Sequence, residues 1–279
     1  MTTAMRRRRA GAARRSWFAR LLREAAVVAR SPALSPSAEP PSALRFGQTE
    51  DMCGRVTLTT PAELVGEMLA DVDWNVADHR PRYNITPQQH LPILLLEDGR
   101  RVARSMRWGL RRYWWRDPKA KQPTNARSET IATTPMFRDL VARRRCVAIT
   151  DGYFEWRGEP GSKQPFHFRD RAGGLLLMAG LWDEWRDADG SALTTFAIAT
   201  TTPNAAASAI HDRMPVILNR DGVDAWIDVT TTPTAQALDL LRPYTGELVI
   251  APVSRLVNQV RHDSPEVIRP VEIEQPRLL

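Results

Sequence analysis

The composition of the chain changes abruptly near residue 51, and this change decides which part can fold into a domain. The first 51 residues are rich in Arg, Ala and Pro and include the run PALSPSAEPPSA at 32–43, which lacks the apolar side chains of a core. They hold ten arginines and four acidic residues, which leaves 29 of the 39 basic and 28 of the 32 acidic residues to the rest. We therefore expect a nearly neutral domain over 52–271, a basic extension before it and a short tail at 272–279.

The extension admits three interpretations. Its apolar residues, such as Trp17, Phe18 and Leu21, fall on one helical face, as in a transit-peptide-like or membrane-surface helix. Its arginines also fit a basic nucleic-acid-binding tail. The third interpretation, that translation starts at Met52, is favoured because the sequence after Met52 has the pattern of a complete domain.

The pattern after residue 52 indicates an α+β fold with antiparallel, barrel-like sheets and flanking helices, because strands and helices do not alternate and turn signals are frequent. Thr60 is a plausible N-cap for a helix whose first position is Pro61. The other expected helices are 128–143, 204–210, 221–227 and 233–241. The expected strands are 91–96, 102–108, 146–150, 174–181, 193–200 and 247–251.

Several kinds of chemistry lack their sequence signals. The five histidines form no HExxH motif, and there is no CxxC, phosphate-binding glycine loop or G-x-S-x-G elbow. We therefore expect no metal and no cofactor. Two cysteines, Cys53 and Cys146, indicate a reduced intracellular setting. No apolar run approaches the ~18–20 residues of a membrane span, so no membrane partner is expected for 52–279.

Seven stretches in one order carry the functional signal: MCGR (52–55), RYNITPQQ (82–89), RWGLRRYWWRDPKAKQPTNARSET (107–130), DGYFEW (151–156), TTTPN (200–204), IHDRMPVIL (210–218), and VSRLVN with RHDSPEVIRPV (253–271). In this order and spacing they resemble the SOS response-associated peptidase (SRAP) family over about 52–271. The resemblance implies covalent capture of abasic sites in single-stranded DNA. It also implies a cysteine nucleophile at Cys53, exposed by loss of the preceding methionine. One departure is WGLRRYW, where the family has an apolar residue and a proline at Arg111 and Arg112.

The chemistry independently requires a terminal cysteine. A free 1,2-aminothiol condenses with an aldehyde through its amine, and the thiol then closes a thiazolidine ring. An internal Cys53 has its nitrogen locked in an amide, so loss of the residues up to Met52 is needed.

The resemblance assigns the other site residues. Glu155 is the implied catalytic glutamate. By strand alternation it shares a face with Tyr153 and Arg157. Partial desolvation there would raise the pKa of its carboxyl toward acid–base use. His211 is the implied catalytic histidine acting on the sugar oxygen. We expect Glu129 to be a first-turn helix acid, and Trp108 and Cys146 to lie in the core. The expected DNA contacts are Asn125, Arg127, Arg55, Arg213, Arg112, Trp114, Trp115 and Trp156.

Three functions remain open at this point. The first is a DNA repair factor of the SOS response, cytoplasmic and nucleoid-associated if bacterial. It would crosslink to abasic single-stranded DNA in a lyase-like reaction, with strand junctions as a further substrate, and we expect a monomer. The second is an autoproteolytic cysteine peptidase that cuts Met52–Cys53 with Cys53, His211 and Glu155. The third is a noncovalent module that binds modified bases.

Overall fold

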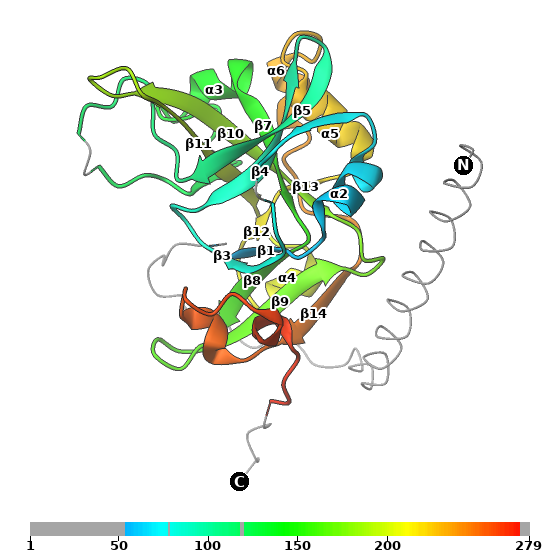
Figure 1. Ribbon diagram of the computed structural model, residues 1–279. Helices are drawn as coiled ribbons and strands as arrows, with labels where there is room; N and C mark the ends of the chain where they lie inside the picture. The colour runs from blue at the N-terminus through cyan, green and yellow to red at the C-terminus, as the bar shows by residue number, and fades with distance from the viewer. Residues whose placement is uncertain (1–53, 78, 118–119, 274–279) are drawn as a thin grey trace, which may run out of the picture. The chain divides into compact units, whose positions relative to one another are not determined.

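Two β-sheets make up most of the described chain (Figure 1). The computed structural model describes residues 54–77, 79–117 and 120–273. Cys53 and the basic extension lie outside the described residues. The expected α+β class with barrel-like sheets is confirmed.

The larger sheet contains a closed five-stranded barrel. Its strands follow the order β11–β10–β7–β4–β5, and β5 pairs again with β11 to close the ring. The closing pair joins Arg107 to Thr195 and Trp108 to Phe196, and the rings of Trp108 and Phe196 stack with centroids 6.3 Å apart. Trp108 is fully buried, as predicted. The barrel strands are β4 (His90–Glu97), β5 (Arg100–Trp108), β7 (Arg145–Thr150), β10 (Leu176–Arg186) and β11 (Ala192–Thr201).

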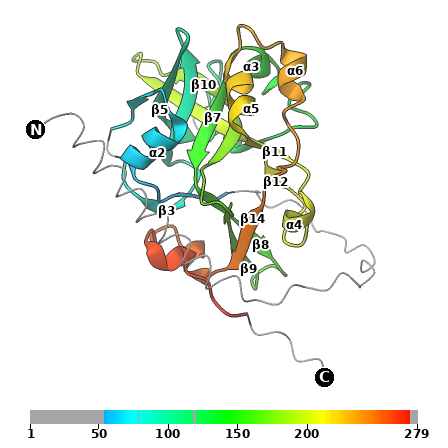
Figure 2. The ribbon, with the colours of Figure 1, turned by 90° about the vertical axis from the view of Figure 1, so that its right-hand side faces the viewer.

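The smaller sheet is antiparallel throughout, in the order β14–β9–β8–β1–β3. A short C-terminal segment with two 3-10 helices covers one of its faces through Phe154, Val253, Val257 and Val267 (Figures 1 and 2). This sheet positions Glu155, which lies on β8. Its elements are β1 (Val56–Leu58), β3 (Arg82–Ile85), β8 (Gly152–Arg157), β9 (Gln164–Asp170) and β14 (Leu248–Pro252), with η1 (Arg255–Asn258) and η2 (Pro265–Ile268).

Most pairings are antiparallel, as expected, but three pairings in the larger sheet are parallel. They are β5 with β11, β6 with β11, and β2 with β5. The chain leaves the edge of β11 after Trp108 and returns to it at Asn125, so both segments run along the same edge in the same direction. The remaining strands are β2 (Val72–Asn75), β6 (Asn125–Arg127), β12 (Met214–Pro215) and β13 (Ile217–Leu218).

The helices are short, and two predictions about them were wrong. The predicted helix 128–143 is helical only at its end, since turns fill most of 128–137. Pro61 takes the N-cap position that was expected for Thr60, whose hydroxyl instead donates to Asp151 Oδ2 at 2.9 Å. Figure 2 separates α2 from α5 and α6, which lie at the upper end of the barrel. The helices are α2 (Ala62–Leu69), α3 (Arg138–Arg143), α4 (Ala205–Ser208), α5 (Arg220–Ile227) and α6 (Thr234–Leu238).

No helix among the described residues is both long and apolar enough to span a membrane.

Candidate active site

Glu155 and His211 meet between the two sheets. Glu155 comes from β8 and is 3% exposed, whereas His211 lies in the loop between α4 and β12. Glu155 Oε2 is 3.9 Å from His211 Nε2, and the His211 side chain is 23% exposed. This separation is longer than a direct hydrogen bond. The pair therefore combines a buried carboxyl with an imidazole that solvent or a ligand can still reach.

The surroundings of His211 favour one tautomer. Burial lowers the pKa of the imidazole, and the charges of Lys163 and Arg213 lower it further, while Asp212 raises it. The backbone N–H of Arg213 donates to His211 Nδ1 at 3.1 Å. Asp212 Oδ1 also lies 2.9 Å from Nδ1, a contact that is favourable only when Nδ1 carries a proton. A neutral imidazole that accepts from Arg213 at Nδ1 carries its proton on Nε2, the nitrogen that lies 3.9 Å from Glu155 Oε2.

Strand β6 brings Asn125 and Arg127 to the same end of β11. Their register partners are Ile198 and Thr200. The guanidinium of Arg213 donates to the Thr200 carbonyl at 2.8 Å, so the His211 loop meets β6 at this point. Arg127 is exposed, and its guanidinium has no ion-pair partner among the described residues. Asn125 is half-buried, and its amide donates to Thr124 Oγ1 at 3.3 Å. Arg127 and Asn125 therefore lie on the part of β11 that the His211 loop contacts through Arg213.

Arg213 is held by Glu129 through both guanidinium amino groups, with Nη2 donating to Oε2 at 2.8 Å. The hydrogen bond from Arg213 is the largest influence on the pKa of Glu129, which it lowers. The expectation that Glu129 is a first-turn helix acid was wrong, because it lies in the turn region between β6 and α3. In this structure Arg213 ties that turn to β11.

The opposite face of β8 carries Trp156, because consecutive strand residues point to opposite faces. Trp156 Nε1 donates to Asn258 Oδ1 at 2.8 Å. Arg55 donates to the Asn258 carbonyl and to Asn84 Oδ1, each at 3.0 Å. Trp156 and Arg55 therefore lie together, but with η1 rather than with the Glu155 side chain.

The structure corrects the assignment of Arg112 to the DNA-contacting set. Arg112 is 1% exposed, and its guanidinium donates to Asp183 Oδ2 at 2.8 Å and to Asp139 Oδ2 at 2.6 Å. Two carboxylates thus satisfy the charge inside the protein, and a contact with DNA would require both ion pairs to break. The sequence could not show this, since neither aspartate is near residue 112 in the chain.

Trp114 and Trp115 lie far along the barrel from His211. Trp114 is 46% exposed, and the carbonyl of Trp115 accepts from Trp185 Nε1 at 2.7 Å. Trp185 pairs with Leu193, which precedes Thr200 by seven residues on β11. At ~3.3 Å per strand residue, Leu193 and Thr200 are roughly 23 Å apart along β11. The expected aromatic contacts and the Glu155–His211 pair therefore occupy different ends of β11.

Strand β1 runs beside Glu155. Val56 pairs with Tyr153, and the backbone N–H of Phe154 donates to the Arg55 carbonyl at 3.0 Å. Extending this register by two residues from Val56 places Gly54 opposite Glu155. Cys53 lies outside the described residues. Cys146, by contrast, is fully buried in the core, as expected, and burial raises the pKa of its thiol.

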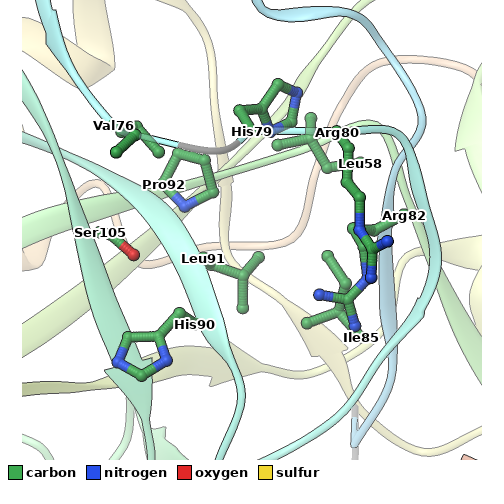
Figure 3. A pocket seen from close by; sticks show the side chains of 11 residues that line it. Leu58, Val76, His79, Arg80, Arg82, Ile85, His90, Leu91, Pro92 and Ser105 are labelled. Atoms are coloured by element: carbon green, nitrogen blue, oxygen red, sulfur yellow. The ribbon is translucent and has the colours of Figure 1, made fainter.

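A pocket of about 240 Å³ lies elsewhere, and none of the predicted site residues lines it (Figure 3). Its polar lining residues are His79, Arg80, Arg82, His90 and Ser105, and its apolar lining residues include Leu91 and Pro92. In the part of the chain that the structure describes, no group of His, Cys, Asp and Glu side chains could hold a metal ion.

Sequence reasoning missed several residues that shape the site. Asp212 lies against the His211 ring, and its position directly after His211 in the sequence HDR (211–213) could have indicated this contact. Lys163 acts on the pKa of His211 from the β8–β9 loop, and nothing in the sequence pointed to it. Asn84 is fully buried and holds Arg55 and three backbone carbonyls of the C-terminal segment.

The chain is similar to known proteins in sequence and in fold. A family model described as SOS response associated peptidase (SRAP) matches residues 52–260. The abasic site processing protein YoqW of Bacillus subtilis (strain 168) is 34% identical over 221 residues, covering 78% of this chain and 99% of that protein. The abasic site processing protein HMCES of Gallus gallus is 34% identical over 232 residues, covering 71% of this chain and 69% of that protein. A crystal structure of a Bacteroides thetaiotaomicron protein superposes with a TM-score of 0.71 at 25% identity, covering 79% of this chain and 100% of that one.

Proposed function

The chain belongs to the SOS response-associated peptidase family, and from this premise we propose that it processes abasic sites in DNA by forming a covalent crosslink through an amino-terminal Cys53. The residues up to Met52 must be absent for this reaction. The target is an abasic site in single-stranded DNA, including one at a strand junction, and the protein acts as a monomer. Such a protein would work in the cytoplasm at the nucleoid in a bacterium.

The reaction begins with opening of the abasic sugar. The C1′–O4′ bond breaks, the hydroxyl proton of C1′ leaves, and O4′ gains a proton, so that C1′ becomes an aldehyde. His211 suits this step because its Nε2 proton is directed to the side where Glu155 lies 3.9 Å away. Glu155 then accepts or returns the protons that move at C1′.

The amine of Cys53 next adds to the aldehyde carbon to give a carbinolamine. Loss of water, with the proton supplied by Glu155, gives an imine. The thiol adds across the C=N bond, its sulfur bonding to carbon and its proton passing to nitrogen, and this closes the thiazolidine. The balance is one aldehyde and one aminothiol giving one thiazolidine and one water.

Binding of the strand is proposed to involve residues near this centre and others further along the barrel. Arg127 is exposed at the end of β6 and suits a phosphate contact, with Asn125 beside it for a sugar or phosphate oxygen. Arg55, Arg213, Trp156, Trp114 and Trp115 remain proposed contacts. Trp114 has the exposed ring that stacking on a base requires.

One observation carries the proposal. A buried glutamate lies 3.9 Å from a reachable histidine, and extending the register of β1 places Gly54 opposite that glutamate. Cys53 directly precedes Gly54 in the chain.

The test mixes protein beginning at Cys53 with an oligonucleotide that contains one abasic site. We expect an adduct that survives denaturation and heating, and we expect none from Cys53→Ala. An undiminished adduct in Cys53→Ala would show that another nucleophile reacts.

A second candidate is autoproteolysis of the Met52–Cys53 bond, with the Glu155–His211 pair as its acid–base groups. Purified full-length chain should then shorten on standing, and Glu155→Gln should stop the shortening. Persistence of the full-length mass in the wild-type chain would reject this activity.

A further inference from the structure

Two neighbouring arginines in the β5–β6 loop are both buried, but only one has its charge compensated. Arg112 lies between the carboxylates of Asp139 and Asp183. Arg111 is 7% exposed and has no ion-pair partner among the described residues. Burying a charge without a partner is unfavourable, so the environment of Arg111 requires an explanation.

The Arg111 guanidinium lies over the ring of Trp185, with its central carbon 3.4 Å from the ring centroid. This cation–π contact is favourable, but it occupies only one face of the guanidinium. Within the described chain, Arg111 Nε has no hydrogen-bond partner. The ring therefore supports the side chain and leaves in-plane donor capacity unused.

A second arginine faces the same space. Arg107 Nη2 donates to Gln122 Oε1 at 3.0 Å, and Arg107 Nε also lacks a partner among the described residues. Burial lowers the pKa of Arg107, and the nearby positive charge of Arg111 lowers it further. His90, the cross-strand partner of Arg107, has its pKa lowered by burial and then by Arg107. Three basic side chains thus lie near one another, and neither arginine has a carboxylate partner among the described residues.

Two glutamine side chains lie at Gly109, which is between Arg107 and Arg111 in the chain. A Cβ atom at Gly109 would lie 2.6 Å from Gln88 Nε2 and 3.2 Å from Gln122 Oε1, so both glutamine side chains crowd this glycine next to Arg107 and Arg111 in the chain. Gly109 has φ of 121°, a conformation that suits glycine. Guanidinium and amide donors around a region of positive charge match the oxygen atoms of a phosphate group.

We propose that Arg107 and Arg111 form a phosphate-binding site that takes a backbone phosphate of the DNA strand, away from the Glu155–His211 pair. Arg107 pairs with Thr195, five residues before Thr200 on β11. At ~3.3 Å per residue the site lies roughly 17 Å along the strand from Thr200. Binding of DNA rests on the proposed function, whereas the phosphate chemistry rests on the two arginines alone. Free phosphate has the same chemistry and is the other source of the group.

The experiment uses the full-length chain with Cys53→Ala, so that noncovalent binding is measured whether or not crosslinking occurs. Binding of intact single-stranded DNA without an abasic site is followed by fluorescence anisotropy at several salt concentrations. The variants are Arg111→Met, which keeps a long side chain over Trp185, and Arg107→Gln. The matched control is Arg171→Met, which removes an exposed arginine paired with Glu247.

We expect each site variant to bind the strand about tenfold more weakly, as expected for loss of a charge-assisted hydrogen bond. The slope of log K against log salt should become shallower by about 0.7 per lost phosphate contact. Arg171→Met should match the parent chain. The melting temperature of Arg111→Met without ligand should stay the same or rise, because an uncompensated buried charge is removed.

A parallel measurement separates the two sources of phosphate. Inorganic phosphate is titrated against the melting temperature of the parent and of both variants. One outcome is that the variants keep the parent's salt dependence of DNA binding but lose the stabilisation by inorganic phosphate. In that case the site is supported and its ligand is free phosphate. The proposal is overturned if Arg107→Gln and Arg111→Met match Arg171→Met in two quantities. These are the salt dependence of DNA binding and the shift in melting temperature caused by inorganic phosphate. A lower melting temperature of Arg111→Met with unchanged binding would likewise overturn it and assign Arg111 to packing on Trp185.

Discussion

Glu155 Oε2 lies 3.9 Å from His211 Nε2, and the two side chains differ in access: the glutamate is almost fully buried, whereas the histidine is partly exposed. Their elements come from different parts of the chain, since β8 belongs to the smaller sheet and His211 precedes β12 at the edge of the barrel. The acid–base pair therefore exists only when both sheets are formed.

Glu155→Gln tests the proton-transfer role. Glutamine keeps the size of the side chain but cannot exchange a proton, so adduct formation should slow by about 10² to 10⁴. Binding of single-stranded DNA by anisotropy should stay within twofold. A rate equal to that of the parent would remove Glu155 from the mechanism.

Asp212→Asn tests the protonation state of His211. Asp212 raises the pKa of His211 against the effects of burial, so its removal should lower that pKa further. If neutral His211 is the active form, the acid limb of the pH–rate profile should move to lower pH. The control is Asp98→Asn, on a turn where asparagine tolerates the left-handed backbone (φ 49°). An acid limb that moves to higher pH, or stays in place, contradicts the assignment.

His167 should dominate the acid sensitivity of the fold. Burial lowers its pKa to about 4, with Arg169 lowering it and Asp151 raising it. The unfolded chain binds a proton near pH 6.5, whereas the native state resists it until about pH 4. The free energy of unfolding should therefore fall by about 3 kcal/mol as the pH drops through this window. Urea unfolding between pH 7 and pH 4 should show that the free energy of unfolding of His167→Gln depends less on pH than that of the parent. An equally steep loss of stability in the variant would mean that other groups cause the acid sensitivity.

Arg112→Met and Arg111→Met should differ in their effect on stability. Removing Arg112 leaves the buried carboxylate of Asp183 without its main partner and should lower the free energy of unfolding by about 3–5 kcal/mol. Removing Arg111 breaks no ion pair among the described residues and should change it by less than about 1 kcal/mol. Urea unfolding at pH 7 compares the two. Equal losses would mean that the two buried charges are equally compensated.

The sequence predicted the strands of the barrel because their apolar runs are long and are bounded by turn residues, as at 91–96 and 193–200. It did not predict β2 or β6, which are short and acquire their conformation from β5 and β11. The sequence also did not predict the parallel pairing of β5 with β11 that closes the barrel, because this pairing depends on the path of the chain after residue 109. Turn-forming pairs such as Asp98–Gly99 signal antiparallel hairpins only.

For the site, motif order pointed to Glu155 and His211, which the structure brings together. It could not separate Arg112 from exposed arginines, because burial at this position depends on Asp139 and Asp183, which lie far away in the chain. Arginines interleaved with tryptophans look alike in sequence whether they contact DNA or fill an internal ion pair. Three-dimensional partners decide between the two.

The most direct test of the account compares two forms of the same chain on one abasic-site oligonucleotide, the full-length protein and the protein that begins at Cys53, by intact mass after denaturation. The account predicts a covalent adduct only with the form that begins at Cys53, at the summed mass of protein and DNA less one water. An adduct of equal yield with full-length protein, or none with either form, would contradict it.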